Sequence, residues 1–160
     1  VTPKKMNLDG GFLGAEEADY VPYIETCDKI HAQTNVAYGM FPNFITPTDT
    51  SGYPAILFWP KGLKETEFEW TQLAPKWSGD EKPDYWNEQE VSFDSIMDED
   101  FQNLEPMQRS HDSGVFESMP LNYQERRIYY YHQVIDDWIG RDNLPENIQV
   151  PNVLDPFIEA

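Results

Sequence analysis

The sequence predicts an α+β fold, in which helices pack against an antiparallel sheet. Three observations support this prediction. Residues 65–73 alternate between polar and apolar side chains, and two runs rich in apolar and aromatic residues, 35–41 and 53–59, precede them. Two longer segments, 86–108 and 123–139, repeat apolar residues at helical spacing. The strands therefore come before the helices along the chain, as in many α+β domains.

The N-terminal part of the chain carries few signals of regular structure. Residues 1–30 are expected to be mostly loop, with one short helix near residues 15–20, because glycines and acidic side chains are frequent there. The sheet is expected within residues 31–75. Turn residues at 46–52 and at 60–62 separate its predicted strands and suit antiparallel connections.

The strand predicted for residues 65–73 has one dry and one wet face. Successive side chains of a strand point to opposite faces of the sheet. Phe68 and Trp70 share one face, whereas Glu67 and Glu69 share the other. We therefore expect the aromatic face to pack against helices and the acidic face to meet solvent.

The second predicted helix has clear signals at both of its ends. Asn122 is expected to cap its start, and Glu125 stands three residues later, which is the spacing of a capping box. Gly140 follows its last apolar residue and is expected to end the helix. The segment between these signals has the length of an ordinary globular helix.

Asp100 lies on the apolar side of the first predicted helix. Helical spacing places it on one stripe with Phe93, Ile96 and Leu104. A carboxylate that faces a core must be paired, neutralised or bound to a metal. An ion pair with an arginine, a hydrogen bond to the backbone, and a rotated helix that exposes the carboxylate are the structural alternatives to a catalytic or metal-binding role. Pro106 is expected to bend or end the helix beyond this point.

Composition excludes some classes of partner. The chain has 160 residues with 29 acidic and 11 basic side chains, and its formal net charge is −18. This charge disfavours nucleic acid and anionic membrane surfaces as partners, and no apolar run approaches the roughly 20 residues of a membrane span. The acidity fits either solubility or the docking of a basic partner. The single cysteine, Cys27, favours a reducing, cytoplasmic location and is expected to pack as a small buried hydrophobe.

Several short motifs occur in one order along the chain. Glu105 and Gln108 follow Asp100 at spacings of five and eight residues. The other motifs, in chain order, are Phe41-Pro42-Asn43, Phe58-Trp59-Pro60 with Glu65-Thr66-Glu67, Ser113-Gly114-Val115-Phe116, and a helix from Glu125 to His132. This ordered set resembles the α subunits of Rieske-type non-haem iron ring-hydroxylating oxygenases over residues 38–140.

The resemblance implies a helix-grip fold, a curved antiparallel sheet packed by a long C-terminal helix, that is incomplete in this chain. It also implies a mononuclear Fe(II) bound by two histidines and one carboxylate, and a Rieske [2Fe–2S] cluster that supplies electrons. By motif match, Asp100 is the carboxylate ligand and the catalytic residue of this chain. The implied reaction uses O2 to hydroxylate an aromatic or other small organic substrate, or to demethylate it. The implied partners are a ferredoxin or reductase and further copies of the parent subunit in a trimer.

The chain departs from the family at the other iron ligands. Its three histidines, His31, His111 and His132, do not form a closely spaced pair upstream of the sheet, since position 36 is Val36. We expect surface or loop roles for the first two and a packing role for His132. One cysteine also cannot hold a Rieske cluster.

These departures predict one catalytic-domain portion of a longer α subunit over residues 1–160, with no Rieske domain and no activity by itself. Its sheet is expected at about residues 31–75, its helices at 86–140 and a C-terminal tail at 141–160. The alternative is an iron-free helix-grip module that binds an apolar small ligand. An acidic subunit that docks a basic partner is a further possibility.

Overall fold

The computed structural model describes residues 24–34, 36–48, 50–116 and 118–152. The chain divides into two compact units, Val1–Pro106 and Met107–Ala160, and each is described by itself. The helix expected near residues 15–20 lies outside the described residues. No helix in the described ranges is long and apolar enough to cross a membrane.

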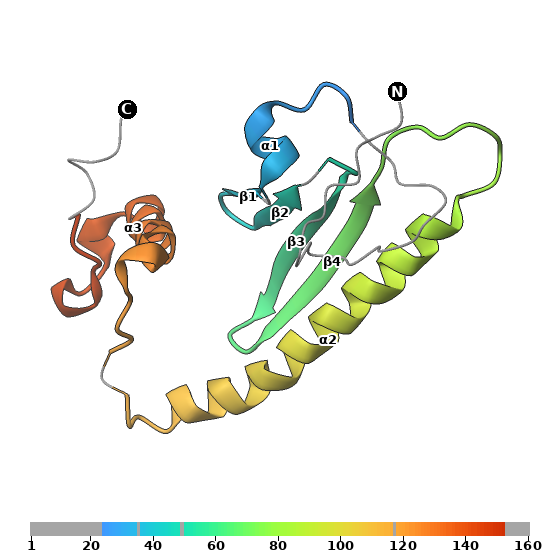
Figure 1. Cartoon of the computed structure of the whole chain (residues 1–160). Coiled ribbons are helices and arrows are strands. Elements are labelled where there is room, and N and C mark those ends of the chain that lie inside the picture. Colours follow the sequence, from blue (N-terminus) through green and yellow to red (C-terminus); the bar gives the residue numbers. More distant parts are fainter. Residues whose placement is uncertain (1–23, 35, 49, 117, 153–160) are drawn as a thin grey trace. The chain divides into compact units, whose positions relative to one another are not determined.

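The first unit contains a four-stranded antiparallel sheet in the order β1-β2-β3-β4 (Figure 1). The strands are β1, Val36–Met40; β2, Phe44–Thr48; β3, Tyr53–Gly62; and β4, Glu65–Leu73. Each strand pairs with the next one along the chain. The predicted α+β fold class is confirmed, and the sheet with its helices is consistent with a helix-grip fold.

Strand β2 is the element of the sheet that the sequence did not predict. Residues 46–48 were expected to form a turn, but Thr46 pairs with Tyr38 of β1. Pro47 and the surrounding polar residues hide the strand, because proline is rare inside sheets. The proline is tolerated here because β2 pairs with β3 only at Phe44 and Ile45, so Pro47 interrupts no β2–β3 hydrogen bond.

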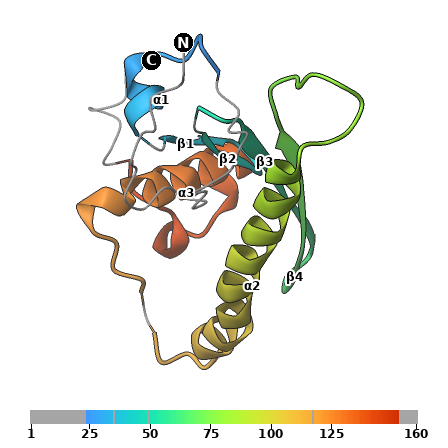
Figure 2. The ribbon, with the colours of Figure 1, turned by 45° about the vertical axis from the view of Figure 1, so that its right-hand side comes forward.

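Helix α2, Asp84–Asp112, packs along the dry face of the β3–β4 hairpin (Figures 1 and 2). The ring of Phe93 lies 4.4 Å from that of Trp70, and the ring of Phe101 lies 4.9 Å from that of Phe68. Phe93 is only 1% exposed. The predicted aromatic face of β4 is therefore confirmed. Burying a side chain of this size contributes about 1.5–3 kcal/mol.

The acidic face of β4 meets solvent, as predicted. Glu67 and Glu69 are exposed, and each has a partner on the neighbouring strand β3. The indole nitrogen of Trp59 donates to Glu69 at 3.0 Å, and the ammonium of Lys61 pairs with Glu67 at 2.8 Å. Such exposed pairs contribute at most about 1 kcal/mol each to the free energy of folding. Packing against α2 therefore stabilises the hairpin more than these pairs do.

Helix α2 is longer than the sequence predicted. A bend or an end was expected at Pro106, but the helix continues to Asp112. The expectation that it ends there was wrong, because one proline removes a single backbone donor and adjoining turns can still form. The division between the two units falls directly after Pro106.

A short helix, α1 (Lys29–Gln33), precedes β1. Its start is capped by Asp28, whose Oδ1 accepts hydrogen bonds from the backbone nitrogens of Ile30 and His31 at 2.9 and 3.0 Å. Five residues are too few to show an amphipathic period, so the sequence did not predict this helix. Cys27, expected to be buried, is half-buried just before the cap.

The second unit is organised around α3, Arg126–Ile139, which a 3-10 turn, η1 (Tyr123–Glu125), introduces. Asn122 and Glu125 form the predicted capping box. Gly140 has a φ of 87° and ends the helix, as predicted. The predicted helix at 123–139 is thus confirmed, with its first turn wound more tightly.

The described part of the C-terminal tail is tied to α3. It contains two short 3-10 turns, η2 (Arg141–Asn143) and η3 (Glu146–Ile148). The buried carboxylate of Asp136 accepts a hydrogen bond from the backbone nitrogen of Val150 at 2.6 Å. The hydroxyl of Tyr129 donates to the carbonyl of Pro151 at 2.6 Å. These bonds hold the tail against the helix up to its last described residues.

Candidate functional site

Asp100 is exposed on α2. The prediction that it faces the core is therefore wrong for the described residues. Helical spacing does place Asp100 on the same side of α2 as Phe93. The hairpin contacts the helix next to Asp100, at the ring of Phe101, and leaves Asp100 itself uncovered. Ile96 is half-buried and Leu104 exposed on the same side of the helix. Helical spacing shows which residues share one side of a helix, but it does not show which of them the sheet covers.

The carboxylate of Asp100 has no hydrogen-bond or ion-pair partner among the described residues, in contrast to some neighbouring acids of α2. Asp94, for example, accepts a hydrogen bond from the indole nitrogen of Trp70 at 3.1 Å. Of the structural alternatives for Asp100, the ion pair and the backbone hydrogen bond are absent from the described part of the chain, and exposure of the carboxylate is the alternative that the structure shows. The carboxylate is instead open to a ligand or to solvent.

The motif residues that follow Asp100 do not gather around it. Glu105 comes five residues later, which corresponds to about 140° around an α-helix, so the two carboxylates point in different directions. The amide of Gln108 donates to Asp112 at 3.0 Å. The helix thus does not bring the Glu105 carboxylate or the Gln108 amide together with the Asp100 carboxylate.

His31 is occupied by two neighbours. Its Nδ1 lies 2.8 Å from Oδ1 of Asp28, and its Nε2 lies 2.6 Å from the hydroxyl of Tyr38. The loop or surface role predicted for His31 is therefore replaced by a role in joining α1 to β1. An aspartate three residues before a histidine at a helix start is the one signal that could have revealed this pair in the sequence.

The other two histidines are exposed. His111 lies on α2 eleven residues after Asp100, or about 16 Å along the helix axis, and its ring is 5.6 Å from that of Phe116. His132 lies on α3, and its ring is 6.1 Å from that of Tyr131. Within the described ranges, no three His, Cys, Asp or Glu side chains are grouped so that they could hold a metal ion. The described residues thus do not fit a complete two-histidine, one-carboxylate iron site.

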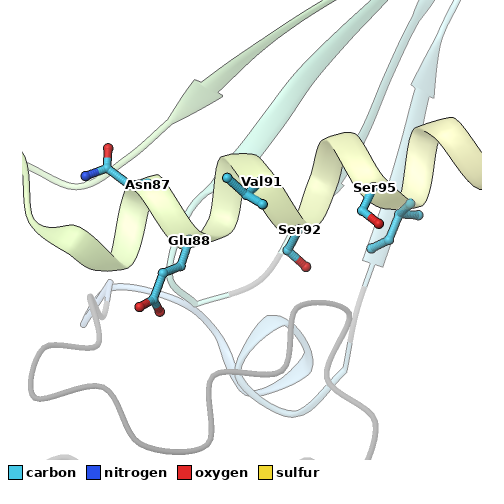
Figure 3. Close-up of a pocket in the computed structure, with 6 residues that line it drawn as sticks. Asn87, Glu88, Val91, Ser92 and Ser95 are labelled. Atoms are coloured by element: carbon cyan, nitrogen blue, oxygen red, sulfur yellow. The ribbon is translucent and has the colours of Figure 1, made fainter.

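The outer side of α2 carries an open hollow of about 590 Å³. Figure 3 shows its lining side chains projecting from the helix. They are Asn87, Glu88, Val91, Ser92, Ser95 and Ile96. Asp100 is not part of this lining, and among the described residues that line the hollow Glu88 is the only one with an ionisable side chain. The described part of the lining therefore offers too few reactive groups for a reaction centre.

Comparison with known proteins decides the family. A sequence model described as the ring hydroxylating α subunit (catalytic domain) matches residues 14–141. The chain belongs to this family. The resemblance read from the order of the motifs is thereby confirmed. Searches of curated proteins and of solved structures gave no match.

The family match covers most of the described helices and strands. The matched range of the ring-hydroxylating α-subunit domain includes the whole sheet, α2 with Asp100, and α3. Proteins of this family are parts of oxidoreductases. The chain is therefore a catalytic-domain portion of a ring-hydroxylating oxygenase α subunit, and its open carboxylate lies inside the matched range.

Proposed function

We propose that the chain forms part of a catalytic domain that uses mononuclear Fe(II) and O2 to hydroxylate an aromatic or other small organic substrate, or to demethylate it oxidatively. The observation that carries this proposal is the position of Asp100. Its carboxylate is open on α2 and lies within the residues that the family model matches. By the spacing of its motif we assign it the place of the family's carboxylate ligand. A carboxylate completes the two-histidine facial triad that leaves positions on Fe(II) open for O2.

Helix α2 suits a residue that must hold a fixed position. The ring of Phe101, adjacent to Asp100, packs on Phe68 of β4. About two turns before Phe101, Asp94 accepts a hydrogen bond from the indole nitrogen of Trp70 in the same strand. Two contacts to one strand fix both the rotation and the position of the helix. We propose that this packing is what orients the Asp100 carboxylate.

The remaining parts of the centre must come from elsewhere. The chain has neither a suitable histidine pair nor the cysteines for a Rieske cluster. We propose that both iron histidines and the [2Fe–2S] cluster belong to polypeptide outside this sequence. On this view residues 1–160 form one catalytic-domain portion of a cytoplasmic parent protein. A ferredoxin or reductase would supply its electrons, and the parent would assemble as a trimer.

Iron loading of the 160-residue chain tests the proposal. The chain would be incubated anaerobically with Fe(II), desalted, and analysed for iron. We expect far less than one iron per chain, because one carboxylate alone is a weak site. Near-stoichiometric iron would contradict the proposal, since it would require His31, His111 or His132 to bind the metal. Absence of iron from the complete parent protein would instead favour the iron-free ligand-binding module.

A further inference from the structure

Three side chains form a hydrogen-bonded chain where α1 meets β1. Oδ1 of Asp28 lies 2.8 Å from Nδ1 of His31, and Nε2 of the same ring lies 2.6 Å from the hydroxyl of Tyr38. The two rings are nearly parallel, at 16°, with centroids 5.9 Å apart. All three residues belong to the first unit, and none of them has a part in the site around Asp100.

The bonding of Asp28 sets the direction of the hydrogen bonds. Its Oδ1 also accepts from the backbone nitrogens of His31 and Ile30. The backbone N–H of His31, then its ring, and last the backbone of Ile30 hold the pKa of the carboxyl below its usual range. An ionised carboxylate can only accept, so Nδ1 of His31 carries the proton and donates it. In the neutral imidazole, Nε2 is then an acceptor for the Tyr38 hydroxyl. This order of carboxylate, imidazole and hydroxyl is the one by which enzymes activate a nucleophilic oxygen.

The phenol is also accessible. Tyr38 is 45% exposed, and it lies on β1, the edge strand of the sheet. A small reagent can therefore approach the hydroxyl, while His31 remains in place to take its proton.

We propose that Tyr38 is an activated phenol and a selective modification site for acyl or sulfonyl electrophiles, with His31 as its general base and Asp28 as the group that orients His31. With an aryl sulfonyl fluoride, the phenol oxygen forms a bond to sulfur and the S–F bond breaks. The phenol proton passes to Nε2 of His31, and fluoride leaves. His31 then returns the proton to solvent.

The full chain provides its own reference for the test. Tyr130 on α3 is 41% exposed, close to the value for Tyr38, and its hydroxyl has no partner within the described ranges. Benzenesulfonyl fluoride would be added, and the labelling of each tyrosine followed over time by peptide mass spectrometry. We expect Tyr38 to react at least about tenfold faster than Tyr130, since a positioned general base contributes 10²-fold or more in enzymes. His31→Gln and Asp28→Asn should lower the rate at Tyr38 toward that at Tyr130 and leave Tyr130 unchanged.

Two outcomes would overturn the proposal. One is equal labelling of the two tyrosines in the folded chain, and the other is an unchanged rate at Tyr38 in folded His31→Gln. Should the variants fail to fold, the natural chain in concentrated urea replaces them. The advantage of Tyr38 should disappear there, and an advantage that persisted in urea would show that it does not come from the folded geometry.

Discussion

Two carboxylates of the first unit show how differently the same side chain can be used. Asp28 accepts three hydrogen bonds at one oxygen, two from backbone nitrogens and one from the ring of His31. Asp100 has no partner in the described part of the chain. The first carboxylate therefore serves local structure, whereas the second is open to a ligand. Sequence spacing placed Asp100 on a core-facing stripe, whereas the structure exposes it.

Asp28 should make the stability of α1 depend on pH. The backbone N–H of His31, and then its ring, lower the pKa of the carboxyl. A lowered folded-state pKa stabilises the folded state above the unfolded pKa, about 3.9, and this contribution is lost as the pH falls through the folded value. The stability difference between the natural chain and Asp28→Ala should therefore be present at neutral pH and vanish in strong acid. Denaturant unfolding at several pH values would measure it, and a difference that does not change with pH would contradict the assignment.

The hydrogen bond from Trp70 to Asp94 should contribute more to the free energy of unfolding than the hydrogen bond from Trp59 to Glu69 on the solvent-facing side of the hairpin. Trp70→Phe keeps an aromatic ring against Phe93 but removes the indole donor that joins β4 to α2. We expect a loss of about 1–2 kcal/mol in the free energy of unfolding. Trp59→Phe is the matched control, because its indole donates to Glu69 within the exposed face of the hairpin, and it should cost about 0.5 kcal/mol or less. Equal losses in urea titrations would refute this difference.

At the scale of elements, α2 is the helix that packs on the sheet and also carries Asp100. Its buried side chains lie in its first half, with Trp86 2% and Phe93 1% exposed. From Asp100 onward its described side chains are exposed, apart from Phe101. The helix is therefore anchored mainly by its first half, and Phe101 supplies a further contact to β4 beside Asp100.

This division predicts unequal effects of truncation along one helix. Phe93→Ala removes a fully buried ring and should destabilise the 160-residue chain by about 3–5 kcal/mol. Leu104→Ala, eleven residues later and 55% exposed, should change stability by about 0.5 kcal/mol or less. Thermal or urea unfolding of both variants would check this. A large loss in Leu104→Ala would show that the second half of the helix is covered as well.

The elements that the sequence predicted well are those with long, regular patterns. Alternation gave the bounds of β4, and the capping box and Gly140 gave those of the helix ending at Ile139. Short elements were missed, since β2 contains a proline and α1 has only five residues. The apolar spacing along α3 does not identify its buried side, because Trp138 is 74% exposed and the buried residues of α3 are Gln133 and Asp136. Asp136 is buried because the tail folds back onto it, which no helical pattern encodes.

At the scale of the whole molecule, the order of the motifs was more informative than any single motif. The family model matches residues 14–141, which include the motif range of 38–140. The order of the motifs can be read from the sequence directly. Burial of a side chain cannot, because it depends on which other parts of the chain cover that side chain. Burial of Asp100 depends on which residues cover one strip of α2, and this is not encoded in the spacing of the helix itself.

Asp100 is the proposed ligand of a centre that needs three protein ligands. Phe101, the residue after it, packs on Phe68 of β4, and the described residues offer no grouped partners for a metal. The proposed function therefore rests on a carboxylate that is positioned by this chain and completed by histidines outside it.

The most direct test is the iron content of the complete α subunit with Asp100→Ala, compared with the natural protein and with Asp98→Ala. Asp98 is an exposed aspartate on the same helix, two residues away, and serves as the matched control. We predict that Asp100→Ala loses its mononuclear iron and its oxygenation while keeping its circular dichroism spectrum, and that Asp98→Ala keeps all three. An Asp100→Ala protein that retains full iron and activity would contradict the central claim.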